Sequence, residues 1–324
     1  MFGIKKNKTD GQELDENWER NTVRKLALAS LEEQRRTKRW GIFFKFLAFA
    51  YLFVLLLMMN PDWSATKKDG DKKHTALVDV SGIISNDADA SADNIVTALR
   101  EAFEDDNTAG VILRINSPGG SPVQSAYIND EIHRLREKYE DIPLYAVISD
   151  LCASGGYYIA AGADKIYANK SSLVGSIGVI MNGFGFVDSM EKLGVQRRLH
   201  TAGEHKGFLD PFSPENPAEV AHVEKVLEQL HQQFIDVVKK GRGERLKDND
   251  KVFSGLIWSG EEALAMGLVD DFASSSYVAR EVIKAEDIVD FTVSKTYLEK
   301  LTERLGASVA THLSSQFGLS GALR

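Results

Sequence analysis

One serine in a glycine-rich segment could carry out acyl transfer. Ser154 lies between Ala153 and the pair Gly155-Gly156, shortly after the apolar run LYAVIS. A serine at the first turn of a helix is exposed, and the unpaired N–H groups there carry a positive partial charge where an oxyanion would develop. We therefore interpret Ser154 as a candidate nucleophile. A helix-capping serine, followed by glycines that allow close packing, is the alternative interpretation of the same residues.

A second loop, NSPGG at residues 116–120, follows the apolar run GVILRI. Its proline fixes one backbone angle, and its glycines allow consecutive N–H groups to turn toward a common point. Taken alone, this loop is also compatible with a simple tight turn. Beside Ser154, it predicts a second oxyanion donor from a neighbouring strand.

The nucleophile also needs a base, which is usually a histidine or a desolvated lysine. None of the seven histidines lies in a recognisable motif. Lys206 belongs to the irregular segment TAGEHKG, residues 201–207. A lysine acts as a base only as the neutral amine, which burial favours. From the residues alone, Lys206 is either a base or, as most loop lysines are, a solvated side chain.

The surrounding segments alternate between two patterns. ALVDV, GVILRI and LYAVIS are short apolar runs typical of strands, and the residues between them repeat at helical spacing. This alternation predicts an α/β fold with a largely parallel sheet, in which sites form at the carboxyl ends of strands. A longer apolar stripe between Ala218 and Lys240 predicts a helix that packs in the core or at a subunit interface.

Composition excludes several classes of protein. The chain has 324 residues, of which 43% are apolar and 27% charged, so a disordered chain is excluded. A net charge of -8 argues against nucleic-acid binding, because that requires clustered Lys and Arg. The single cysteine, Cys152, excludes an internal disulfide and a cysteine-built zinc site, and we interpret it as a packing residue.

The run WGIFFKFLAFAYLFVLLLMM, residues 40–59, predicts a transmembrane anchor. As a helix it is about 30 Å long, close to the hydrocarbon thickness of a bilayer. Four basic residues precede it within five positions, which places the N-terminus in the cytoplasm. A cleaved signal peptide is the alternative, but about forty residues are too long for its n-region.

The predicted organisation has four parts. Residues 1–39 form a cytoplasmic tail, residues 40–59 the anchor and residues 60–74 a polar linker. Residues 75–324 form an extracytoplasmic domain that contains Ser154 and the two glycine loops.

Four motifs carry a resemblance to a known family. NSPGG, ASGGYYIA (153–160), VGSIGV (174–179) and GEHKG (203–207) occur in an order and spacing that resemble the short form of signal peptide peptidase A, SppA. The members are membrane-anchored bacterial serine proteases. The resemblance extends over roughly residues 75 to 275 and implies a crotonase/Clp-protease-like fold.

The resemblance also implies roles for individual residues. Ser154 would attack the scissile carbonyl, and Lys206 would take its proton. Ser176, in VGSIGV, would orient that lysine, and the N–H groups of Gly120 and Gly155 would hold the oxyanion. Neither a cofactor nor a metal is implied.

Partners and location follow from the same resemblance. Related enzymes form homo-oligomeric rings or domes, often of eight subunits, with sites at subunit boundaries. Their substrates are extended apolar peptides such as remnant signal peptides. The implied location is the bacterial inner (plasma) membrane, crossed once, with the catalytic domain in the periplasm or otherwise outside the cytoplasm.

Two other functions compete with this interpretation. A proteolytically inactive oligomeric scaffold would bind membrane proteins without cutting them. An acyl-CoA-processing enzyme would share the crotonase fold, but such enzymes act on soluble esters in the cytoplasm, whereas this domain is predicted to lie outside.

Overall fold

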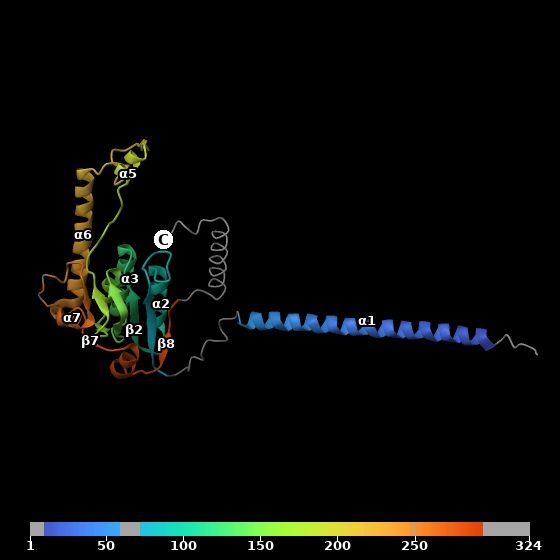
Figure 1. Ribbon diagram of the computed structural model, residues 1–324. Coiled ribbons are helices and arrows are strands. Elements are labelled where there is room, and N and C mark those ends of the chain that lie inside the picture. Colours follow the sequence, from blue (N-terminus) through green and yellow to red (C-terminus); the bar gives the residue numbers. More distant parts are fainter. Residues whose placement is uncertain (1–9, 59–71, 248, 250, 294–324) are drawn as a thin grey trace, which may run out of the picture. The chain divides into compact units, whose positions relative to one another are not determined.

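The chain forms two compact units (Figure 1). In one unit the structure describes a single helix, α1 (Asp10–Met58), which takes up most of the predicted tail and nearly all of the predicted anchor. No helix in the described part of the chain has the length and hydropathy of a membrane span. Met59, most of the predicted linker and the C-terminal end of the predicted domain lie outside the described residues. The computed structural model describes residues 10–58, 72–247, 249 and 251–293.

The second unit is built on one mixed sheet. Among the described residues its main strand order is β6-β5-β3-β2-β1-β8, while β4 pairs with β3 and β7 pairs with β4. Every pairing is parallel except that of β5 with β6, which confirms the predicted α/β class. The strands are β1 (His74–Ser81), β2 (Thr108–Ser117), β3 (Leu144–Ala153), β4 (Lys165–Ala168), β5 (Leu173–Gly175), β6 (Ile257–Ser259), β7 (Asp271–Phe272) and β8 (Ile288–Asp290).

The helices begin where the sequence places capping residues. Ser121 caps α3 with Pro122 as the first helical residue, and Ser259 forms a capping box with Glu262 at the start of α7. The helices of this unit are α2 (Ala92–Glu104), α3 (Pro122–Lys138), α4 (Gly155–Ala160), α5 (Val187–Lys192), α6 (Pro217–Arg242), α7 (Gly260–Ala265) and α8 (Ser275–Tyr277), with the 3-10 helix η2 (Gly243–Arg245) and the π-helix η3 (Val278–Ile283).

The core lies between the sheet and the helices that connect its strands. Ile95, Leu99 and Phe103, spaced four residues apart, are buried on one face of α2. That face packs with the equally buried residues of β1 and β2. The helical and strand periodicities read from the sequence are therefore confirmed in this region.

The strand β3 changes neighbour along its length. Its first half pairs with β4 from Tyr145 to Val147, and its last three residues pair with β5. Ala153, the last residue of β3, is thereby in register with Gly175, the last residue of β5. The residues that follow these two strands must therefore lie next to each other.

The long helix α6 is anchored at its C-terminal end. Phe234, Val238 and Arg242 are its buried residues, and the Arg242 guanidinium donates hydrogen bonds of 2.8 and 2.9 Å to the Asp270 carboxylate. Its N-terminal half leaves the apolar stripe only partly covered, and Val226 is 40% exposed. The stripe predicted for core or interface thus enters the core only near its end.

Candidate active site

Ser154 occupies the turn between β3 and α4. Its backbone angles are φ 51° and ψ -121°, and non-glycine residues seldom adopt a positive φ. The Ser154 N–H donates to the Gly175 carbonyl at 2.8 Å, and the Ser154 carbonyl accepts from the Tyr158 N–H at 3.0 Å. Its side chain makes no capping hydrogen bond. Ser154 is thus the N-cap residue of α4 by position, but its side chain does not cap the helix, and the hydroxyl is left half-exposed, as a nucleophile requires.

The NSPGG loop contacts the same turn. A Cβ atom placed on Gly119 would lie 2.7 Å from both the Gly155 nitrogen and the Ser154 Cβ. A Cβ atom on Gly155 would lie 3.3 Å from the Gly120 nitrogen. Only glycine backbones can approach so closely. The structure thus brings together the two loops that the sequence placed at neighbouring strand ends.

Two backbone donors are available at this contact. The loop is held to the segment after β1, because the Ile84 N–H donates to the Gly119 carbonyl at 2.9 Å and the Ser121 N–H donates to the Ile84 carbonyl at 2.8 Å. The hydrogen bonds of the described residues include none donated by the N–H of Gly120 or Gly155. Unpaired N–H groups beside a hydroxyl are the elements of an oxyanion hole.

Ser176 follows β5 as Ser154 follows β3. It has the same φ of 51°, and its N–H donates to the Leu256 carbonyl at 2.7 Å. Because Ala153 pairs with Gly175, the two serines stand one residue beyond the same pair of strand ends. Ser176 is therefore next to the candidate nucleophile, where its hydroxyl could orient a base.

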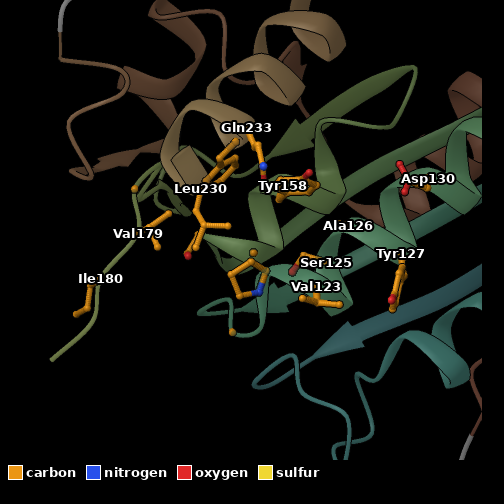
Figure 2. A pocket seen from close by; sticks show the side chains of 16 residues that line it. Val123, Ser125, Ala126, Tyr127, Asp130, Tyr158, Val179, Ile180, Leu230 and Gln233 are labelled. Atoms are coloured by element: carbon orange, nitrogen blue, oxygen red, sulfur yellow. The ribbon is translucent and has the colours of Figure 1, made fainter. Parts of the chain in front are cut away.

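A pocket of about 360 Å³ opens beside Ser154 (Figure 2). Its walls come mainly from α3 and α6, which the sequence did not associate with the site. Their apolar side chains suit an extended peptide, and Asp130 is the one charged residue of the lining. The lining residues are Gly120, Pro122, Val123, Ser125, Ala126, Tyr127, Asp130, Ser154, Gly155, Tyr158, Gly178, Val179, Ile180, Leu230, Gln233 and Phe234.

Lys206 lies outside this pocket. It is exposed, and it belongs to an arm of residues 178–216 that includes α5 and reaches the N-terminal end of α6 (Figure 1). The turn around it is held to α6 by Glu219, whose carboxylate accepts from the Leu209 N–H at 3.2 Å and lies 3.4 Å from His205 Nδ1. A single copy of the chain therefore does not place Lys206 beside Ser154.

The buried thiol behind Ser154 does not compete as a nucleophile. Cys152 is completely buried, and this burial raises the pKa of its thiol far above its ordinary value. Since only the thiolate is strongly nucleophilic, Cys152 is inert. Within the described ranges, no group of three or more His, Cys, Asp or Glu side chains could hold a metal ion.

A family model matches the part of the chain that contains Ser154. Residues 136–290 fit the model of peptidase family S49. An Enterococcus faecium protein named as a signal peptide peptidase SppA is 31% identical over 235 residues, covering 70% of this chain and 68% of that protein. Protease 4 of Haemophilus influenzae is 33% identical over 250 residues, covering 74% of this chain and 39% of that protein.

Other similarities are partial. A Brucella melitensis protein named as the Na(+)/H(+) antiporter NhaA is 44% identical over 172 residues, which are 53% of this chain and 23% of that protein. This chain thus spans less than a quarter of that relative. The solved structure of a membrane-bound stomatin-specific protease superposes with a TM-score of 0.40 at 18% identity, over 63% of this chain and 81% of that one.

Proposed function

The chain belongs to peptidase family S49, and from this membership we propose that it is a serine endopeptidase with a crotonase/Clp-protease-like fold and Ser154 as nucleophile. The observation that carries the proposal is the position of Ser154. It lies on a strained turn against the NSPGG loop and beside a largely apolar pocket. Strained turns of this kind are a recurrent way to expose a nucleophilic serine.

The proposed mechanism uses the groups around this turn. Ser154 Oγ attacks the scissile carbonyl while Lys206 Nζ takes its proton. The oxyanion of the tetrahedral intermediate accepts hydrogen bonds from the N–H groups of Gly120 and Gly155. Lys206 then returns the proton to the leaving amine, and water hydrolyses the acyl-enzyme by the same steps.

In this mechanism Lys206 comes from a second copy of the chain. Lys206 is exposed in one copy, whereas a lysine base must be desolvated, so a neighbouring surface has to cover it. The arm carries large exposed apolar side chains, among them Phe184 at 82% and Leu193 at 78% exposure. Such patches are typical of protein interfaces. Ser176, next to Ser154, would receive and orient the incoming lysine in a homo-oligomer, such as the ring of eight that the resemblance implies.

We further propose a membrane location. Helix α1 carries a run of exposed apolar side chains, including Phe46 and Phe49, which are both 74% exposed. This run is proposed to anchor the chain in a bacterial inner membrane with its N-terminus in the cytoplasm. The substrates would be extended apolar peptides, such as remnant signal peptides, which the pocket walls suit.

The test combines a fluorophosphonate probe with turnover of a fluorogenic apolar peptide. We expect the wild-type chain to be labelled and Ser154→Ala to remain unlabelled. Turnover should fall by about 10³-fold or more in Lys206→Ala. The control variant Lys192→Ala removes another exposed lysine from the arm and should retain wild-type turnover. A folded wild-type chain that is neither labelled nor active would instead favour the inactive scaffold.

A further inference from the structure

The Ser154 pocket extends along one face of α3 to a carboxylate. Val123, Ala126, Tyr127 and Asp130 recur at intervals of three and four residues, so they share one face of the helix. From Val123 to Asp130 this face is about 10 Å long. Figure 2 shows Asp130 across the pocket from Ile180, with Ser125 and Val123 between them.

Asp130 and its neighbour Glu131 differ in how their carboxylates are paired. In the described part of the chain the Asp130 carboxylate makes no hydrogen bond and no ion pair. The adjacent Glu131 accepts from both nearby arginines, Arg100 at 2.6 Å and Arg134 at 2.5 Å. One carboxylate is thus neutralised from two sides, while its neighbour presents its charge to the pocket.

Two titratable side chains interact with Asp130, and neither is a cation at neutral pH. His133, one turn further along α3, has its pKa lowered by burial, with smaller contributions from Lys240 and Arg136. It is therefore neutral at pH 7. Burial, followed by the charge of Asp130, raises the pKa of the Tyr158 phenol, which also stays neutral.

The path from Ser154 to this carboxylate is apolar. The Tyr158 and Phe234 rings lie 5.1 Å apart between centroids and form one wall. Val123 and Tyr127, which are 55% and 59% exposed, belong to the α3 side. An aliphatic chain can pack against this apolar wall, and a positively charged group at the end of that chain can pair with the Asp130 carboxylate.

Resting on the proposed protease function, we propose that this pocket is a subsite for a basic side chain of the peptide and that Asp130 is its specificity-determining residue. The aliphatic stem of a lysine or arginine would pack against Tyr158 and Val123, and its cationic group would pair with the Asp130 carboxylate. Signal peptides combine a basic n-region with an apolar h-region, and this pocket would recognise their junction.

Binding tests the subsite without requiring turnover. The full-length Ser154→Ala chain is titrated with fluorescent apolar peptides that carry lysine, norleucine or glutamate at one position, which is moved along the peptide. Norleucine has the stem of lysine without its charge. At one position we expect lysine to bind roughly fivefold more tightly than norleucine, and glutamate more weakly than both.

Three further substitutions locate the effect. Asp130→Asn should abolish the preference for lysine, and Asp130→Lys should transfer it to glutamate. Glu137→Gln removes the same charge from an exposed position of α3 outside the pocket and should leave the preference unchanged. The subsite would be overturned if the lysine and norleucine peptides bound with equal affinity at every position, or if no peptide bound. It would also be overturned if Asp130→Asn and Glu137→Gln changed the preference for lysine equally.

Turnover by the wild-type chain separates the two proposals. A lysine preference that depends on Asp130, in a chain that cuts none of these peptides, would support the subsite and contradict the protease function. Cleavage of the lysine and norleucine peptides at equal kcat/KM at every position would support the protease and overturn the subsite.

Discussion

Ser154 and Ser176 share a backbone conformation that side-chain-bearing residues avoid. Both have a φ of 51°, and both follow the last residue of a paired strand. The Ser154 angles match the first central position of a type II′ turn, which glycine dominates. Such a residue costs about 1–3 kcal/mol and persists where its surroundings impose it, which is typical of functional positions.

This strain predicts the stability of two inactive variants. Ser154→Ala keeps a Cβ atom at the positive φ, whereas Ser154→Gly removes it. The relief outweighs the additional freedom that glycine gives the unfolded chain, so Ser154→Gly should be about 1 kcal/mol more stable than Ser154→Ala. Thermal unfolding measures the difference, and neither variant should react with the probe. An alanine variant at least as stable as the glycine variant would show that the turn is unstrained.

At the scale of elements, the site depends on the contact between the NSPGG loop and the start of α4. Neither element makes a site alone. The loop contributes the N–H group of Gly120, and the helix contributes the N–H group of Gly155. The two can approach only because residue 119, Gly119, has no Cβ atom. The register of β2, β3 and β5 sets this approach, because the loop and both serines follow the ends of these strands.

Gly119→Ala tests the contact, with Gly82→Ala as a matched control. Both glycines have a positive φ, 97° and 82°, so alanine strains the backbone at either position. A Cβ atom on Gly82 meets nothing within 4 Å, whereas one on Gly119 collides with Ser154 and Gly155. Both variants should lose roughly 1 kcal/mol to the strained φ.

Activity should distinguish the two variants. Gly119→Ala should also lose about 10²-fold or more in kcat/KM, because Ser154 and the oxyanion donors are displaced. Peptide turnover by variants that remain folded checks this expectation. Similar rates for Gly119→Ala and Gly82→Ala would show that the loop is not part of the catalytic machinery.

At the scale of the whole molecule, one copy of the chain holds the proposed nucleophile, Ser154, without the proposed base, Lys206, beside it. The Ser154 pocket is lined by neither lysine nor histidine, and Lys206 is exposed on the arm. The arm and the N-terminal half of α6 leave apolar side chains uncovered, as interfaces do. These features agree with the proposal that a second copy completes the site.

Mixed assemblies test whether the site is shared. Ser154→Ala and Lys206→Ala chains are each expected to be inactive. Co-expressed in equal amounts, they should regain about a quarter of wild-type turnover, because a site is intact when its serine comes from one variant and its lysine from the other. Co-assembly of either variant with itself is the control. No recovery in assemblies shown to contain both chains would place the two residues in one copy.

Local patterns along the chain were enough to predict several strands and helices. The strands from ALVDV to LYAVIS and the long helix α6 were predicted correctly, because apolar periodicity is a local property. The position of Ser154 between a strand and a helix was predicted for the same reason. The roles of Lys206 and Ser176 rest on family resemblance and stay predictions.

Which residues meet across the fold could be read from the packed structure and not from local patterns. The change of neighbour along β3 sets Ser154 beside Ser176, and no local pattern reports such a register. The pocket walls on α3 and α6, including Asp130, come from segments about a hundred residues apart, so their proximity depends on how the helices pack against the sheet. The separation of Lys206 from Ser154 could not be predicted either, because the spacing of motifs along a chain carries no information about their distance in the folded protein.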